Sequence, residues 1–202
     1  MREVVLDIET IPCSPSDWNT LDDELKKKFL RDEDSDEDAR KRTGLDPALG
    51  RVVCIGLLFV TGGELQPKML SGEDEPALLT EFWKAIEPQD YVIGHNVISF
   101  DLPFIRARSV VCQVKPSRKF DLRRFSSDTV YDTQEVWSNW EWQRRPKLAL
   151  LANAFGLGKK LGSGGEVEDW YERKDWQTIE RYCEQDVRLT YEIYQRMKAY
   201  GL

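Results

Sequence analysis

The sequence predicts an α/β fold in which helices flank a mixed central sheet. Apolar runs in residues 3–9 and 51–60 are typical of buried strands. Apolar side chains at helical spacing occupy residues 74–87 and, near the C-terminus, residues 175–198. The order of three strands, a helix, a strand and further helices therefore indicates a mixed sheet rather than an all-β or all-helical protein.

The first three predicted strands form a meander. After the strand at 3–9 and a charged insert, strands are expected at 51–60 and 64–70, joined by a turn at Gly62 and Gly63. The next element, at 74–87, is a helix that should cover the sheet. Its apolar face is formed by Ala77, Leu78, Phe82 and Ile86.

The second half of the chain is predicted to be mainly helical. A short strand at 91–94 leads into a helix at about 102–112, which has Pro103 in its first turn. The elements expected after it are helices at 129–140 and 147–156, a glycine-rich loop at 158–165 and the last helix at 175–198.

The length of 202 residues and the hydrophobic content of 41% are those of one globular domain. We expect a single domain over residues 1–202, with a charged insert at about 14–48. Mixed charge and few apolar residues predict a short helix and a solvated loop in this insert, and no chemistry is assigned to it.

The net charge of −7 does not by itself favour a nucleic-acid partner, but the charges are unevenly distributed. Residues 106–124 carry seven lysines and arginines against one acid, which is either a positive track for nucleic acid or an ordinary solvated surface. The four cysteines are far apart and form no CxxC pair, which argues against a zinc knuckle and a disulfide framework. We expect no membrane partner and a cytoplasmic location, because no transmembrane run or signal peptide is recognisable.

Two acids, Asp7 and Glu9, lie inside the first apolar strand. Strand side chains alternate between faces, so both carboxylates should point from the same face. Because two partly buried anions repel each other, a cation between them is an economical explanation. The alternative is an ordinary solvated acid pair, since the same spacing recurs at Asp34, Asp36 and Asp38.

Two further motifs carry acids or a phenol at defined spacing. Asp101 stands at a predicted strand-to-helix junction, where it is either a functional acid or a plain helix cap. Tyr182 and Asp186 are four residues apart in the last helix and share one face. Taken singly, Tyr182 could be a core aromatic and Asp186 a solvated helix acid.

Together the three motifs resemble the DEDD superfamily of 3′–5′ exonucleases, tyrosine subclass. The closest likeness is to the proofreading exonuclease domain of family-B DNA polymerases and its free-standing PolB-like bacterial relatives. The matching segments are DIET at 7–10, GHNVISFDLPFI at 94–105 and YCEQDVRLTYEIY at 182–194, with KLALLANAFGL at 147–157 and residues 164–171.

The resemblance implies an RNase H-like fold that begins with a three-stranded meander, and a hydrolase that uses two divalent cations, Mg²⁺ or Mn²⁺. By this resemblance, Asp7, Glu9 and Asp186 would ligate one cation, and Asp7 and Asp101 the other. Oxygen ligands without a Cys or His cluster suit these ions. Tyr182, a poor base at neutral pH, would orient the attacking water.

The resemblance also implies substrate contacts by Thr10, Asn96 and Phe100. Phe100 could equally be a core residue. His95, the only histidine, is favoured as a structural residue beside the second motif. Three tryptophans either stack on unpaired bases or pack on the sheet, namely Trp137, Trp140 and Trp142.

The expected activity is removal of nucleoside monophosphates from the free 3′ end of a nucleic acid, with single-stranded DNA favoured and RNA possible as a substrate. The alternatives are a 3′–5′ exoribonuclease that trims RNA and a catalytically silent nucleic-acid-binding module. The chemistry of phosphodiester hydrolysis does not distinguish the two sugars, and no motif reveals a contact to a 2′-hydroxyl. Protein partners and the oligomeric state are not indicated by the sequence.

Overall fold

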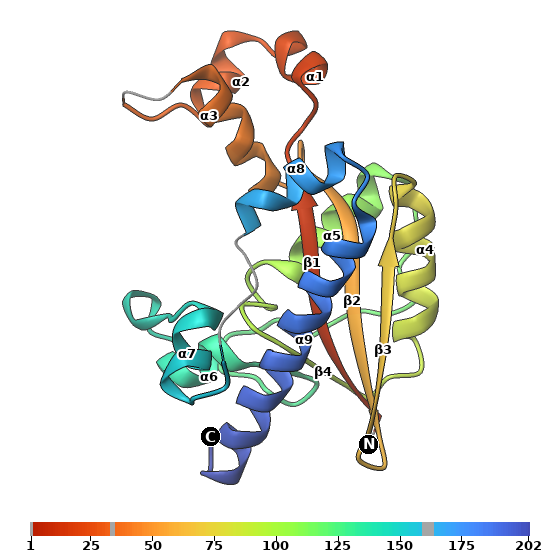
Figure 1. Ribbon diagram of the computed structural model, residues 1–202, viewed down its shortest axis with the longest axis vertical. Helices are drawn as coiled ribbons and strands as arrows, with labels where there is room; N and C mark the ends of the chain where they lie inside the picture. The colour runs from red at the N-terminus through yellow and green to blue at the C-terminus, as the bar shows by residue number, and fades with distance from the viewer. Residues whose placement is uncertain (1, 33–34, 159–163) are drawn as a thin grey trace.

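The computed structural model describes residues 2–32, 35–158 and 164–202. Its five strands form one sheet in the order β3-β2-β1-β4-β5 (Figure 1). The central strand β1 pairs antiparallel with β2 and parallel with β4. The strands are β1 (Glu3–Ile11), β2 (Arg51–Thr61), β3 (Glu64–Ser71), β4 (Tyr91–Gly94) and β5 (Val130–Asp132).

Helices cover both faces of this sheet, and the alternation of β1 side chains decides which residues meet which helices. Val4, Leu6 and Ile8 belong to the core beneath α4 (Glu75–Ile86) and α5 (Asp101–Val111). Val5 belongs to the core beneath the long helix on the opposite face. That helix is α9 (Trp176–Ala199), drawn in blue across the sheet in Figure 1. The odd-numbered residues of β1 therefore face α9.

The parallel strands β1 and β4 are paired only near their N-terminal ends. β1 pairs with β4 only over Glu3–Val5, while its pairing with β2 continues to Ile11 with an irregularity between Glu9 and Thr10. Beyond Val5, no strand of the described residues lies beside this edge of β1. This open edge at the carboxyl end of β4 leaves room for side chains, as in other α/β sheets whose sites lie where strands diverge.

The predicted helix at 129–140 is wrong in its first part. Residues 130–132 form the parallel strand β5, and α6 (Thr133–Ser138) begins directly after it. Val130 and Tyr131 are buried, and Asp132 caps α6 by accepting hydrogen bonds from the N–H groups of Gln134 and Glu135. A strand of three residues is too short to show a period of two, so the apolar spacing could not separate it from the helix.

Two more of the described helices lie in the C-terminal half. They are α7 (Leu148–Ala154) and α8 (Val167–Glu172), with single 3₁₀ turns at Trp142–Arg144 and Gly164–Glu166. The sequence did not predict α8, and most of the expected loop at 158–165 lies outside the described residues. Among the described residues, no helix is long and apolar enough to cross a membrane.

The insert is more ordered than its composition suggests. It contains α1 (Pro15–Thr20), α2 (Asp23–Lys27) and α3 (Asp36–Arg42), followed by a 3₁₀ turn at Thr43–Leu45, at the top of Figure 1. The prediction of one short helix and a solvated loop is therefore wrong. Few apolar residues suffice here because they gather into one small core, made of Cys13, Trp18, Phe29 and Ala39.

Candidate active site

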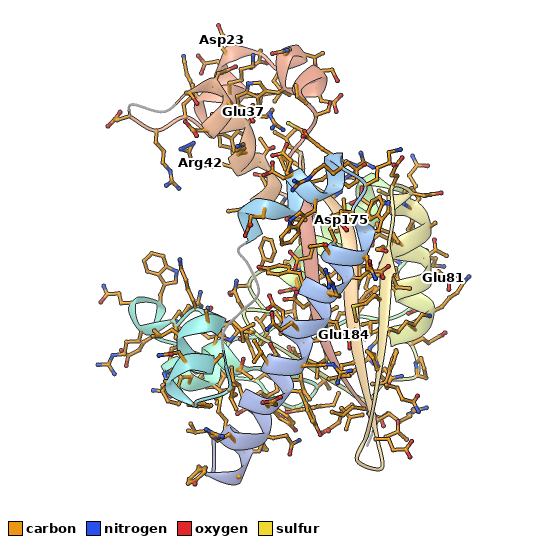
Figure 2. All side chains as sticks on the ribbon, viewed as in Figure 1. Asp23, Glu37, Arg42, Glu81, Asp175 and Glu184 are labelled. Atoms are coloured by element: carbon orange, nitrogen blue, oxygen red, sulfur yellow. The ribbon has the colours of Figure 1, made fainter. Side chains whose placement is uncertain are left out.

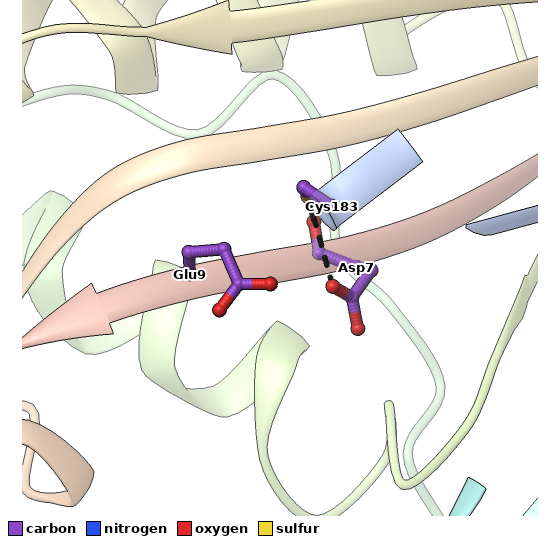
Figure 3. A group of neighbouring side chains, drawn as sticks. All are labelled: Asp7, Glu9 and Cys183. Atoms are coloured by element: carbon purple, nitrogen blue, oxygen red, sulfur yellow. Dashed lines mark hydrogen bonds between the residues drawn. The ribbon is translucent and has the colours of Figure 1, made fainter. Parts of the chain in front are cut away.

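Asp7 and Glu9 project from β1 on the side of α9, as the strand alternation requires (Figure 3). Glu9 is buried, with 6% of its surface exposed, and Asp7 is half-buried. Two carboxylates with restricted access to water repel each other and lose hydration. The first motif is thus a pair of acids held together by the strand itself.

Helix α9 brings a third group to this pair. The Cys183 Sγ lies 3.6 Å from Asp7 Oδ2, an approach drawn as a dashed line in Figure 3. Gly56, which faces Asp7 across the β1–β2 ladder, makes this approach possible. A Cβ on Gly56 would lie 2.7 Å from Cys183 Sγ, so only glycine lets α9 come this close to the sheet.

The three side chains can supply ligand atoms that all lie within 4.8 Å of one another. Hydrogen bonding to Cys54 and burial raise the pKa of Cys183 well above its ordinary value. The thiol therefore stays protonated and donates to Asp7, while the carboxylate oxygens of Asp7 and Glu9 are the atoms that could hold a metal ion. An oxygen donor set of this kind fits Mg²⁺ or Mn²⁺ better than a soft metal.

Asp101 is the first residue of α5 and lies beside the open edge of β1. Its Oδ1 accepts a hydrogen bond from the Ile8 N–H at 3.0 Å, which replaces the strand pairing that β4 no longer provides. Burial is the main reason that the pKa of Asp101 is raised to about 8, and the charges of Asp132 and Asp186 add to it. Asp101 is only 3% exposed and α5 has no side-chain cap hydrogen bond, so this acid contacts the strand that carries Asp7 and Glu9 rather than serving as a plain helix cap.

Tyr182 and Asp186 lie one turn apart on α9, and both are buried. The Tyr182 ring packs edge-on against Trp170 at 5.3 Å between centroids and belongs to a small core with Ile11 and Val167. Tyr182 is thus firmly positioned by packing. Its role in orienting water stays a prediction.

The predicted substrate residues divide into two groups. Thr10 and Phe100 line a cavity of about 370 Å³, together with Glu9. Asn96 is not among the residues lining this cavity. It occupies the loop after β4 with a left-handed φ of 66°, and its N–H donates to Asp132.

Asp132 is a positioning residue that the sequence reasoning missed. Its carboxylate accepts hydrogen bonds from the N–H groups of Asn96 at 2.9 Å and Ile98 at 3.0 Å, in addition to capping α6. It therefore fixes the loop that leads from β4 to Asp101. The segment Asp132-Thr-Gln-Glu135, an Asp followed three residues later by Glu, was the available signal.

His95 lies in the same loop and bridges two other segments. Its Nδ1 is 2.9 Å from Thr133 Oγ1, and its Nε2 is 3.0 Å from the Pro146 carbonyl oxygen. Since both ring nitrogens contact protein groups, these contacts agree with the structural role favoured from the sequence. His95 thereby ties the end of β4 to the segment before α7.

The three tryptophans and the basic segment have mixed environments. Trp137 and Trp140 pack edge-on or tilted against Phe155 and Phe125, whereas Trp142 is 77% exposed. Within residues 106–124, Arg108 is buried and pairs with Glu75 at 2.6 Å. Neither the tryptophans nor the basic residues therefore form a uniform surface for nucleic acid.

A family described as "Predicted 3'-5' exonuclease related to the exonuclease domain of PolB" matches residues 45–201 of this chain. The chain belongs to this family. The matched segment includes Asp101, Tyr182 and Asp186, while β1 and most of the insert precede it. The resemblance to the PolB exonuclease domain is confirmed, and β1 joins the family's segment through its ladders with β2 and β4.

Among solved structures, this member of the PolB-related family is similar to the family B DNA polymerase from the hyperthermophilic archaeon Pyrobaculum calidifontis, with a TM-score of 0.64 and 19% identity. The alignment covers 98% of this chain and 24% of the polymerase, so the chain spans about a quarter of that protein. The RNase H-like fold, a mixed five-stranded sheet with flanking helices, is thereby confirmed. No curated protein sequence matches the chain.

Proposed function

We propose that this chain is a metal-dependent 3′–5′ exonuclease that hydrolyses nucleic acids from a free 3′ end, with single-stranded DNA favoured, and releases nucleoside monophosphates. The observation that carries the proposal is the convergence of Asp7 and Glu9 beside α9 in a member of the PolB-related family. Two neighbouring carboxylates in a partly buried site have a clear chemical use if they hold cations.

Two divalent cations, Mg²⁺ or Mn²⁺, would be held by Asp7, Glu9 and Asp186 at one position and by Asp7 and Asp101 at the other. When bound, they supply the positive charge that stabilises the attacking and leaving oxygens of phosphodiester hydrolysis. Asp101 must lose its proton to serve as a ligand, and burial raises its pKa to about 8. Cation binding should therefore release a proton near neutral pH and become stronger as pH rises.

The protein's own groups would position the strand end and the attacking water. Thr10 and Phe100 line the cavity beside Glu9, where the terminal nucleotide would lie. Asn96 would assist from the loop that Asp132 holds. Tyr182 would orient the water, since a tyrosine hydroxyl is a poor proton acceptor at neutral pH.

The test is hydrolysis of matched 5′-labelled single-stranded DNA, single-stranded RNA and duplex DNA with Mg²⁺, Mn²⁺ or EDTA. We expect metal-dependent shortening from the 3′ end, fastest on single-stranded DNA, that is lost in Asp7→Ala. Asp23→Ala, which removes an exposed acid of the insert, is the matched control and should retain full activity. Faster cleavage of RNA would identify an exoribonuclease, and binding without cleavage under every condition would indicate a silent module.

A further inference from the structure

The cavity beside Glu9 is built from two separate parts of the chain. The body of the fold contributes Glu9 and Thr10 from β1 and Phe100 from the residue before α5. The insert contributes Lys41 and Leu45, from the end of α3 and the turn that follows it. A volume of about 370 Å³ is within the range of small-ligand sites.

Buried polar contacts fix the end of α3 relative to the body. The Arg40 guanidinium pairs with Glu168 of α8 at 2.6 Å, and it also donates to the Cys13 carbonyl oxygen at 2.7 Å. Arg40 is 4% exposed, so this ion pair is shielded from water. The Thr10 hydroxyl donates to the Gly44 carbonyl oxygen at 2.7 Å, which joins the insert directly to β1.

Lys41 differs from the two arginines on either side of it. Arg40 is used in the buried pair. Arg42, labelled in Figure 2, also lines the cavity, but it donates to the Phe29 carbonyl oxygen. Lys41 is exposed on the cavity wall, and within the described part of the chain its side chain makes no ion pair or hydrogen bond. The nearby acid Glu37 is engaged by Arg40.

The lining combines the chemistries that a nucleotide requires. Leu45, which is 69% exposed, and Phe100 offer apolar surface for a base or sugar. Lys41 offers a positive charge for a phosphate. We propose that the end of α3 and the turn after it are part of the substrate site and that Lys41 binds a phosphate near the 3′ end of the strand, an inference that rests on the proposed function.

Lys41 lies just before the segment that the family model matches, which begins at residue 45. The sequence had assigned no chemistry to the insert, since a charged segment read alone does not reveal which of its residues are fixed against the body. The contacts of Arg40 and Gly44 supply that information.

The experiment measures binding of 5′-labelled single-stranded DNA of 4 and 20 nucleotides by fluorescence anisotropy in EDTA, across a series of salt concentrations. Wild type is compared with Lys41→Gln, Lys41→Arg and the control Lys27→Gln, which removes an exposed lysine elsewhere in the insert. We expect Lys41→Gln to weaken binding of both oligonucleotides by roughly three- to tenfold and to reduce the salt slope by about 0.7. Lys41→Arg should retain wild-type binding, and Lys27→Gln should leave it unchanged.

Steady-state hydrolysis with Mg²⁺ or Mn²⁺ separates the two proposals. Lys41→Gln should raise KM and leave kcat unchanged, because it removes a binding contact rather than a group at the reacting atoms. Wild-type affinity and salt slope in Lys41→Gln would overturn the inference while the nuclease proposal stands. A wild-type protein that cleaves nothing but binds DNA through Lys41 would overturn the proposed activity and leave this contact intact.

Discussion

Asp101→Asn should stabilise the metal-free protein at neutral pH. Burial raises the pKa of Asp101 from its ordinary 3.8 to about 8, so the folded protein binds a proton that the unfolded chain releases. The stability contributed by protonated Asp101 is fully present below about pH 4 and is lost as pH rises through 8. An asparagine at this position would stay neutral at every pH, and its amide oxygen can still accept the hydrogen bond from Ile8.

The size of the effect follows from the pKa difference. Each pH unit between the unfolded and folded pKa values costs about 1.4 kcal/mol, which sets a ceiling of about 4 kcal/mol at pH 7. Asp132 and Asp186 interact electrostatically with Asp101, so the three groups do not titrate independently. We therefore expect the free energy of unfolding to rise by about 2–4 kcal/mol at that pH. For a chain of 202 residues this corresponds to a rise in Tm of roughly 5–15 °C.

Urea unfolding in EDTA at pH 4, 5, 6, 7, 8 and 9 measures this difference directly. The stability advantage of Asp101→Asn should be near zero at pH 4, grow up to pH 8 and then stay constant. Asp121→Asn is the control, because Arg123 lowers the pKa of Asp121 to about 2 and its replacement should have a small effect of opposite sign. An advantage that does not change with pH would refute the assignment of a buried, protonated Asp101.

Three further predictions concern the positioning of the site. Tyr182→Phe should slow hydrolysis without abolishing it, because it removes only the hydroxyl; an unchanged kcat would contradict the water-orienting role. Gly56→Ala should lower the free energy of unfolding by about 1–3 kcal/mol, measured in urea, because its Cβ would meet Cys183 Sγ at 2.7 Å. Asp132→Ala should lower it by about 1–3 kcal/mol, because it leaves the part-buried N–H donors of Asn96 and Ile98 without their acceptor, whereas Asp132→Asn should be milder. Equal stability of the two Asp132 variants would show that the acceptor is unimportant.

The long elements could be predicted because their side chains repeat over many residues. The alternation in β1 assigned Asp7 and Glu9 to one face, and the helical spacing in α9 placed Tyr182 and Asp186 one turn apart. The strand β5 was missed because three residues carry too little periodic signal. Sequence periodicity thus showed which side chains share a face of a long strand or helix, but it did not show whether a short segment is a strand or a helix.

The tertiary details of the site could not be predicted, because they depend on contacts between distant residues. The approach of Cys183 to Asp7 joins residues 176 positions apart, and it depends on a missing side chain at Gly56. The place of Lys41 on the cavity wall depends on the ion pair between Arg40 and Glu168, which are 128 positions apart. Rules based on short sequence spacings cannot predict contacts between residues so far apart in the chain.

The central claim is that the acids of β1 support metal-dependent cleavage from the 3′ end. Its most direct test is one time course of a 5′-labelled 20-nucleotide single-stranded DNA with Mn²⁺, run in parallel for wild type, Asp7→Ala and wild type in EDTA. The account predicts a ladder of products that shorten one nucleotide at a time in the first reaction and intact DNA in the other two. The same ladder from Asp7→Ala would contradict it.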